Sequence, residues 1–361
     1  MAKHQFALIG CGMVGQHHIT AIEGVRGARL AAICDVNEQA ARRFADANDV
    51  PWYTDYHEML EAQPEVDVVN VCTPSGLHLE PALAAIEAER HCVVEKPLEI
   101  TLDRCDQLIE AADRAGVHLA TIFPSRFGAA ARELRKALDQ GRFGRLTIGD
   151  AIVRWWRTQD YYDSGGWRGT WKLDGGGALM NQSIHCVDLI QWYMGDAKAV
   201  SAIAGCLAHE RIEVEDAAIV AVEWANGAFG VVQGTTAAWP GFDKRIAISG
   251  DAGSAVLEED RLTVWQFQRE RQRDQKVRAG QAGAEDHGSG ASDPMAFSPE
   301  NHRRQLADFC KAIDKGTRPL VDGREGRKAV EIILAAYRSA ETGRRVELPL
   351  DPSYRPGRRR K

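Results

Sequence analysis

A glycine-rich segment near the N-terminus has the spacing of a phosphate-binding turn. Gly10, Gly12 and Gly15 form a G-x-G-x-x-G pattern between an apolar run and a stretch of helical length. The first glycine allows a tight turn, the second lets the backbone approach a pyrophosphate, and the third allows close helix packing. Met13 and Val14 would open the helix, whose free N–H groups favour phosphate.

An acidic residue follows the second expected strand at the distance that a dinucleotide site requires. Asp35 stands twenty residues after Gly15. A carboxylate there accepts hydrogen bonds from both adenosine ribose hydroxyls and repels a 2′-phosphate, so the pattern predicts NAD as the cofactor. Arg42 and Arg43 make NADP the second choice, and a flavin is less expected.

A lysine ends the fifth expected strand, at the edge where open α/β sheets bind ligands. Residues 93–97 read Val-Val-Glu-Lys-Pro. The ammonium of Lys96 could hydrogen-bond a substrate hydroxyl and stabilise the developing alkoxide, or take part in its proton relay. From the residues alone, the alternative is a surface lysine paired with Glu95.

A histidine lies on an expected helix between two other polar residues. Asn181, His185 and Asp188 follow each other at i, i+4 and i+7, which predicts one shared helical face. Because histidine titrates near neutral pH, His185 could accept a hydroxyl proton, with Asp188 or Asn181 fixing its tautomer or touching the substrate. The alternative is an interior histidine bonded to a backbone carbonyl. A metal site is not expected, because one histidine and one carboxylate make a thin ligand set.

The segment just before this helix is dense in aromatic and polar residues. Residues 161–171 include Tyr162, Trp167 and Arg168, whose types suit the apolar faces and hydroxyls of a sugar. Arg126, at the expected junction between domains, is a further candidate substrate contact. The alternative for the aromatic loop is a subunit interface, which also recruits tryptophan, tyrosine and arginine.

Length and composition indicate an ordinary globular protein of about two domains. The chain has 361 residues, of which 44% are hydrophobic, and its net charge of −6 argues against a nucleic-acid partner. No apolar run reaches membrane-spanning length, and the N-terminus leads straight into an apolar strand without room for a signal peptide. Eight cysteines without a C-x-x-C pair suggest small buried thiols in a reducing compartment, so we expect a cytoplasmic protein without a membrane partner.

Strand and helix signals alternate through residues 1–124. Apolar strands are expected at 6–9, 29–34, 66–72, 92–95 and 118–122, and helices at 15–23, 38–47, 77–89 and 102–115. Short apolar strands separated by helices predict a doubly wound parallel sheet, that is, an α/β Rossmann domain.

The rhythm changes over residues 125–350, which predict an α+β domain for substrate binding and oligomerisation. Expected helices are 129–140, 179–194, 299–315 and 323–342, and expected strands are 146–156, 200–207, 216–224, 228–236, 244–249, 252–257 and 262–268. Strands without intervening helices indicate a large, mostly antiparallel open sheet. Residues 269–294 are expected to form a flexible excursion without a core, and residues 351–361 a solvated tail.

The combined motifs resemble the glucose–fructose oxidoreductase/inositol dehydrogenase/MocA (Gfo/Idh/MocA) family of NAD(P)-dependent sugar dehydrogenases. The matching elements cover nearly the whole chain: residues 10–15, residues 72–75 with His78, residues 95–97, and residues 181–188. The resemblance implies that Lys96 and His185 are catalytic, facing the nicotinamide and the substrate across a shared crevice. It further implies that the following residues line the cofactor site: Thr73, Pro74, Ser75, His78, Glu95, Lys96 and Pro97.

One position departs from the family pattern. The family carries Asp-x-x-x-His on this helix, whereas the present chain has Asn181 before His185. Since an amide cannot act as a base, Asn181 is at most a substrate or orienting contact, and the proton chemistry rests on Lys96 and His185.

The resemblance implies NAD-dependent oxidation of a secondary hydroxyl on a sugar, a sugar derivative or a cyclitol. Residues 72–78 and 181–185 are similar to nucleotide-sugar 3-dehydrogenases acting on UDP-N-acetylated hexuronates, and related patterns occur in inositol and free-hexose dehydrogenases. Two alternatives stay open: a hydrolase or epimerase that oxidises transiently and retains NAD, and a non-catalytic NAD or sugar sensor. An open sheet with one uncovered face also predicts a homodimer or homotetramer.

Overall fold

The computed structural model describes residues 3–280, 291 and 298–357, and these form two compact units. The first unit comprises Met1–Pro124 and Pro299–Arg327, and the second comprises Ser125–Ser298 and Lys328–Lys361. The expected division after residue 124 coincides with the end of the first segment. Residues 299–327, expected in the second domain, cluster with the first.

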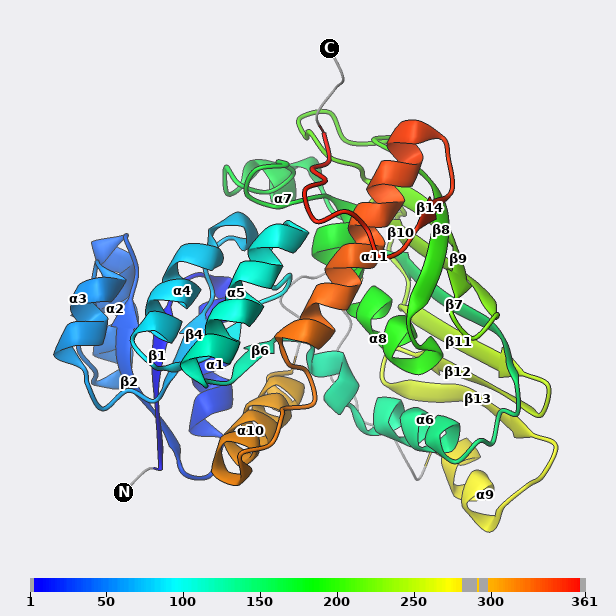
Figure 1. Cartoon of the computed structure of the whole chain (residues 1–361), viewed down its shortest axis with the longest axis horizontal. Coiled ribbons are helices and arrows are strands. Elements are labelled where there is room, and N and C mark those ends of the chain that lie inside the picture. The colour runs from blue at the N-terminus through cyan, green and yellow to red at the C-terminus, as the bar shows by residue number, and fades with distance from the viewer. Residues whose placement is uncertain (1–2, 281–290, 292–297, 358–361) are drawn as a thin grey trace. The chain divides into compact units, whose positions relative to one another are not determined.

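A six-stranded parallel sheet forms the centre of the first unit (Figure 1). Its strand order is β3-β2-β1-β4-β5-β6, so the order reverses between β1 and β4, as in dinucleotide-binding folds. The strands are β1 (His4–Ile9), β2 (Ala28–Cys34), β3 (Trp52–Tyr53), β4 (Val68–Val71), β5 (His91–Val94) and β6 (Leu119–Thr121). The expected Rossmann domain is confirmed.

Helices cover both faces of this sheet because right-handed crossovers run in opposite directions from the reversal point. The helices are α1 (Met13–Glu23), α2 (Glu38–Asn48), α3 (Tyr56–Ala62), α4 (Leu79–Glu87), α5 (Leu102–Ala115) and α10 (Glu300–Lys315), with a 3₁₀ turn at Ser75–Leu77. The late helix α10 packs on α1, and its Leu306 and Phe309 join the core cluster of Phe6 and Ile22. This apolar burial explains why α10 belongs to the first unit.

A mostly antiparallel eight-stranded sheet forms the second unit, as expected. Its strand order is β13-β12-β11-β7-β10-β9-β8-β14, and only the β10–β7 pair is parallel. The strands are β7 (Leu146–Arg154), β8 (Ala197–Gly205), β9 (Ala217–Trp224), β10 (Phe229–Thr235), β11 (Arg245–Gly250), β12 (Gly253–Glu258), β13 (Arg261–Phe267) and β14 (Val346–Glu347).

One face of this sheet carries the helices of the second unit (Figure 1). They are α6 (Ala129–Asp139), α7 (Gln159–Asp163), α8 (Ile184–Met194), α9 (Gln272–Arg278) and α11 (Gly323–Thr342), with a 3₁₀ turn at Pro124–Phe127. Burial alternates along β9, where Val220, Val222 and Trp224 point into the core and Ile219 is exposed. Such alternation is typical of a sheet with one covered face.

Two segments expected to lack structure are held in place by side-chain hydrogen bonds. Within residues 269–294, α9 is held by Asp274, whose carboxylate accepts bonds from Arg142 (2.6 Å) and from Trp265 Nε1 (2.8 Å). Residues 351–357 are tied to α11, because Glu341 accepts bonds from Tyr354 Oη and Gly357 N. The expectation of no structure is therefore wrong for 272–278 and 351–357. Residues 281–290, 292–294 and 358–361 lie outside the described residues.

The structure also differs from the sequence-based expectation in smaller ways. It contains β3, α3 and β14, which the sequence patterns did not predict, and the helix expected at 179–194 starts differently. Ala178–Ser183 forms a π-helical turn before α8 begins at Ile184.

Among the described residues, no helix is long and apolar enough to span a bilayer. All eight cysteines are free thiols, and six are buried.

Candidate active site

The glycine turn lies where the strand order of the parallel sheet reverses. Gly10 follows β1 with φ of +105°, and a Cβ there would lie 2.6 Å from the carbonyl carbon of Cys72, just after β4. A Cβ at Gly15 would lie 2.6 Å from the Gly10 oxygen. The protein's own packing therefore demands glycine at both positions.

The middle glycine differs, because nothing in the described protein demands it. A Cβ at Gly12 would meet no described atom within 4 Å. Gly12 is the N-cap of α1 and provides no side-chain cap, and the following Met13 and Val14 are exposed. An exposed turn with uncapped amides suits close approach by a pyrophosphate, so these residues fit the cofactor predicted for them.

Asp35 is held at the same edge of the sheet by two backbone amides. Its Oδ2 accepts from Cys11 N (2.7 Å) and its Oδ1 from Asn37 N (2.8 Å). The carboxylate is only half-buried, so its remaining lone pairs can accept from ribose hydroxyls. Cys11 belongs to the glycine turn, and this bond therefore fixes the acid relative to the phosphate-binding backbone.

Replacing Asp35 should change cofactor selectivity. In Asp35→Ser the repulsion of a 2′-phosphate is lost together with two charge-assisted bonds, so we expect NADH affinity to fall about 10- to 100-fold and NADPH affinity to rise. Asp35→Asn keeps an acceptor oxygen and should lose less. Titrations of intrinsic fluorescence with NADH and NADPH measure both affinities. Unchanged selectivity in Asp35→Ser would show that this carboxylate does not meet the ribose.

The turn after β4 is fastened to the lysine turn after β5 by His78. The imidazole is fully buried, with Nδ1 2.8 Å from the Pro97 oxygen and Nε2 3.0 Å from the Thr73 oxygen. Ser75 is buried and Pro74 half-buried. His78 therefore differs from the expected cofactor contact: within the described structure it positions two backbone turns.

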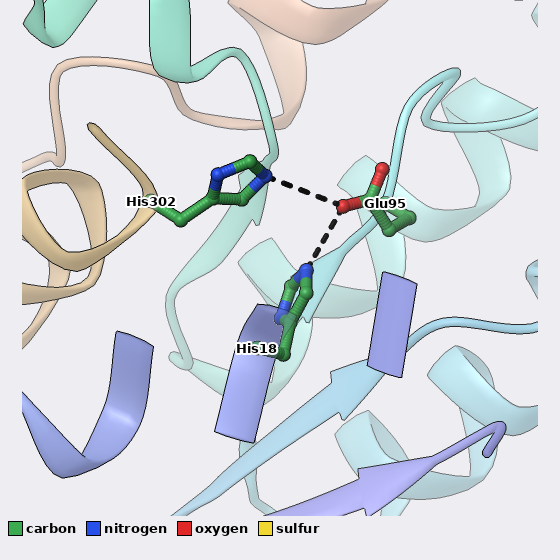
Figure 2. Close-up of side chains that lie close together, drawn as sticks. All are labelled: His18, Glu95 and His302. Atoms are coloured by element: carbon green, nitrogen blue, oxygen red, sulfur yellow. Dashed lines mark hydrogen bonds and ion pairs between the residues drawn. The ribbon is translucent and has the colours of Figure 1, made fainter. Parts of the chain in front are cut away.

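Lys96 follows β5 beside a buried carboxylate. Lys96 is half-buried, and the Lys96–Pro97 peptide is cis. Glu95 Oε2 accepts from Lys96 N (3.0 Å), while Glu95 Oε1 accepts from His18 Nε2 (2.9 Å) and lies 3.9 Å from His302 Nε2 (Figure 2). The lysine turn is thus anchored from α1 and α10 as well as from the sheet.

Burial and hydrogen bonding act on Glu95 in opposite directions. Burial alone would raise its pKa, but the hydrogen bond from His18 and the charges of His18, His302 and Lys96 outweigh it and lower the pKa to about 2. Burial lowers the pKa of His302 to about 4, against the attraction of Glu95. Glu95 is therefore an ionised carboxylate at neutral pH.

Two of the predicted site residues of the second unit reach the surface from an otherwise buried helix. Along residues 178–194, only Asn181, His185 and Trp192 are half-exposed, and the remaining residues are buried. Asn181 lies in the π-helical turn and donates from Nδ2 to Asp174 Oδ1 (2.5 Å). Asn181 and His185 are thus the two partly exposed residues among the predicted site residues of this stretch of helix.

Asp188 and Arg126 form a buried ion pair. The guanidinium donates from Nε to Oδ2 (2.9 Å) and from Nη2 to Oδ1 (2.6 Å), and Arg126 and Asp188 are both fully buried. Arg126 also contacts the ring of Trp192. The expected substrate contact of Arg126 is not supported by this position, because the guanidinium is committed to Asp188 inside the core. Both carboxylate oxygens of Asp188 accept hydrogen bonds from Arg126.

A second buried acid, Glu215, caps the start of the same helical stretch. Its carboxylate accepts from Gly177 N (3.0 Å), Leu179 N (2.8 Å) and Tyr337 Oη (2.9 Å). A Cβ at Gly177 would lie 1.8 Å from the backbone carbonyl oxygen of Glu215, so the close approach of these two backbone segments requires glycine. Burial raises the pKa of Glu215 to about 7, against the lowering effect of these hydrogen bonds.

This raised pKa predicts a pH-dependent stability. Between pH 4.5 and pH 7 the folded protein keeps a proton on Glu215 that the unfolded chain releases, so stability falls as pH rises through this window. We expect Glu215 to contribute a loss on the order of 2–3 kcal/mol between pH 5 and pH 8, measured by urea unfolding as the difference between the profiles of wild type and Glu215→Gln. Glu215→Gln should flatten the profile, whereas Glu210→Gln, at an exposed position, should not. Parallel profiles for wild type and Glu215→Gln would contradict the assignment.

The aromatic loop contains one buried tyrosine and one arginine between rings. Tyr162 is buried, and its hydroxyl pairs with Thr236 Oγ1 (2.8 Å), so it supports the loop from inside rather than meeting a ligand as expected. The Arg168 guanidinium lies 4.9 Å from the ring of Tyr161 and 4.7 Å from that of Trp167. Tyr161 Oη in turn accepts from Gln182 Nε2, next to Asn181 in the chain.

Sequence reasoning missed the residues that position these groups. His18 lies next to His17 three residues after the glycine motif, which is a weak local signal. His302 and Glu215 lie far along the chain from the groups that they contact, and nothing near them in sequence marks that contact.

The parallel sheet with a glycine turn at its reversal point, and with Asp35 and Lys96 at the same edge, is the arrangement of an NAD-binding Rossmann oxidoreductase. Residues 4–123 match the model of the oxidoreductase family with an NAD-binding Rossmann fold, and residues 131–256 match the GFO/IDH/MocA C-terminal domain. The chain belongs to the Gfo/Idh/MocA family, as the motifs predicted.

Individual relatives span nearly the whole chain. Myo-inositol 2-dehydrogenase of Thermotoga maritima is 29% identical over 358 residues, covering 95% of this chain and 98% of the relative. The WlbA dehydrogenase of Bordetella pertussis, solved with NADH and UDP-GlcNAcA, superposes with a TM-score of 0.87 at 34% identity, covering 97% of this chain and 99% of that one. The WlbA dehydrogenase of Chromobacterium violaceum, solved with the same ligands, gives the same TM-score and identity.

Proposed function

We propose that this protein oxidises a secondary hydroxyl of a nucleotide-linked, N-acetylated hexuronate to a ketone, with NAD as hydride acceptor. The observation that carries the proposal is that Lys96 leaves β5 at the sheet edge that holds the glycine turn and Asp35. Similarity to two proteins solved with NADH and UDP-GlcNAcA supports the substrate class.

Arg168 supports an anionic substrate. Its guanidinium lies over the rings of Tyr161 and Trp167, and no ion pair of Arg168 with a carboxylate is found among the described residues. Its Nε is buried without a hydrogen-bond partner there. The two rings hold the guanidinium in place, and no carboxylate of the described residues pairs with it. Such a guanidinium can bind a carboxylate or a phosphate of the substrate. We therefore assign substrate contacts to Trp167, Arg168, Asn181 and His185.

The proton chemistry falls to Lys96 and His185. When bound, NAD supplies the hydride acceptor at its nicotinamide C4. Lys96 Nζ binds the reacting hydroxyl and stabilises its oxygen as negative charge develops, and an imidazole nitrogen of His185 takes up the proton. Asn181 orients the sugar through its amide. Thr73, Pro74, Ser75, Glu95 and Pro97 shape the nicotinamide side of the site, while His78 holds their turns together.

A substrate panel tests this proposal. Purified protein with NAD should form NADH with UDP-GlcNAcA faster than with UDP-GlcNAc, free N-acetylglucosaminuronate, myo-inositol or glucose. Preference for myo-inositol would overturn the substrate class while keeping the dehydrogenase. Conversion of substrate without net NADH, by protein that retains its cofactor, would favour the transient-oxidation hydrolase or epimerase. Ligand binding without conversion of any compound would favour the sensor.

We also propose that the chain forms a homodimer or homotetramer through the uncovered face of its eight-stranded sheet. This face exposes Ile148, Ile219, Phe229 and Val231 on the neighbouring strands β7, β9 and β10. Phe229 pairs in register with Ile148, so the apolar side chains are contiguous. Contiguous exposed apolar surface is typical of interfaces, and a single patch that serves both subunits produces twofold symmetry.

A charge placed at the centre of this patch should prevent assembly. Phe229→Glu buries a carboxylate against Ile148 of the same sheet and against the second copy, so the variant should sediment as a monomer. Phe242→Glu, at an exposed position outside this sheet, is the control and should keep the wild-type mass. A monomeric wild-type protein in sedimentation equilibrium would refute the proposed interface.

A further inference from the structure

Three side chains with metal-binding donor atoms lie close together in the first unit, and one of them belongs to Glu95, the residue before Lys96. His18 comes from α1, Glu95 follows β5, and His302 comes from α10 (Figure 2). One ligand atom from each lies within 4.8 Å of the others. His18 Nε2 is 2.9 Å and His302 Nε2 is 3.9 Å from the same oxygen, Glu95 Oε1. No spacing in the sequence predicted this cluster.

The donor set and its dimensions suit a small divalent transition-metal ion. Two imidazole nitrogens and one carboxylate oxygen form a recurrent Zn²⁺ ligand set, with bonds of about 2.0–2.1 Å. Tetrahedral bonds of that length separate ligand atoms by about 3.3 Å. The two separations from Glu95 Oε1 lie on either side of this value, and all three ligand atoms lie within 4.8 Å of one another, so metal binding requires adjustment of both His18 and His302 around Glu95.

Asn70 on β4 contacts the ring nitrogen of His18 that faces away from Glu95. Its Nδ2 is 2.8 Å from His18 Nδ1, its side chain is fully buried, and its Oδ1 has no hydrogen-bond partner within the described structure. In this state His18 donates from Nε2 to Glu95. Turning the Asn70 amide presents Oδ1 to His18 Nδ1, so the imidazole proton moves from Nε2 to Nδ1 and the Nε2 lone pair becomes available to a metal.

This change loses no proton: it pairs Asn70 Oδ1 with the imidazole and moves Nδ2 to the buried position that Oδ1 held. Metal-binding histidines commonly donate their second ring N–H to a neighbouring oxygen, and Asn70 Oδ1 would supply it. The Glu95 carboxylate is 7% exposed and faces two imidazoles, so a divalent cation would offset a buried negative charge.

We propose that His18, Glu95 and His302 form a binding site for a divalent transition-metal ion of the Zn²⁺ type, with Asn70 as the hydrogen-bond acceptor behind His18. The site goes beyond the proposed function and does not depend on it. It lies within one unit, adjacent in sequence to the lysine assigned to proton chemistry.

Metal titration of untagged, chelator-treated full-length protein tests the proposal. Wild type should bind one Zn²⁺ per chain in isothermal titration calorimetry, and Co²⁺ should give the strong visible absorption of a tetrahedral site. His302→Ala should weaken Zn²⁺ binding at least tenfold. His17→Ala is the matched control, because it removes a neighbouring imidazole outside the ligand set and should bind as wild type.

The measurements need no substrate, so their failure is separate from failure of the proposed oxidation. Should His302→Ala fold poorly, as judged by circular dichroism and NADH binding, His302→Gln replaces the ligand with an amide of similar size. Absence of saturable binding at one ion per chain in wild type overturns the proposal. Wild-type affinity in a folded His302 variant overturns it equally.

Discussion

Lys96→Ala is expected to lower the rate of NADH formation about 10²–10⁴-fold, the range that positioned proton-transfer groups contribute. The ammonium is the charged group that leaves β5 beside the nucleotide-binding edge, so its loss removes stabilisation of the developing alkoxide. Affinity for NADH should stay within a few fold, because the glycine turn and Asp35 are untouched. Steady-state kinetics and fluorescence titration measure the two quantities separately.

Three further variants sharpen this expectation. Lys96→Arg keeps the charge but holds its proton too tightly for a relay, so it should stay at least about tenfold below wild type. Lys311→Met removes an exposed lysine of the same unit and should be neutral. His185→Ala should also lose activity, and its effect should not multiply with that of Lys96→Ala, since groups acting on one proton are not additive. A Lys96→Ala enzyme that keeps a tenth of the wild-type rate would contradict this role of Lys96, whereas a variant that kept its full biological effect would favour the sensor.

Arg126→Ala should destabilise the protein by about 3–5 kcal/mol, because it removes the cation that faces the buried Asp188 carboxylate. Both residues are fully buried and joined by two hydrogen bonds. Urea unfolding at pH 7 measures the loss. Arg114→Ala is the matched control: its pair with Glu110 is exposed on α5, so we expect a change below about 0.5 kcal/mol.

A double variant separates the cost of the unpaired charge from the contribution of the pair. Arg126→Met with Asp188→Leu replaces both ions with apolar groups and should recover a large part of the stability lost by either single change. If the double variant were as unstable as the sum of the singles, the pair would not act as a unit, and the structural assignment of Arg126 would be wrong.

The predictions for Lys96 and for Arg126 rest on different kinds of inference. The chemistry-bearing residues of the first unit could be identified from spacing, because each follows a strand in chain order. In a parallel sheet such residues meet at one edge, so the predictions for Gly10 and Asp35 needed only the strand pattern and the glycine motif. The family resemblance decided the predictions for Lys96 and His185, which the residues alone left as a possible surface lysine and a possible interior histidine.

The partners of these residues could not be identified in the same way. Arg126 and Tyr162 have the types of substrate contacts, yet their side chains are buried by tertiary packing against Asp188 and Thr236. His78 matched a cofactor motif, but it bonds to two backbone carbonyls. Residue type predicts the chemistry that a side chain can perform, whereas burial decides whether a ligand can reach it.

By itself, the sequence predicted most of the strands and helices in their order, the dinucleotide turn, NAD as the cofactor and the position of the lysine after β5. These depend on local periodicity and on residues close together in the chain. Only the tertiary structure decided that α10 packs against α1, that His302 reaches Glu95, and that Glu215 caps the helix of His185. Such contacts join segments that are distant in sequence, and they depend on how apolar faces pack together.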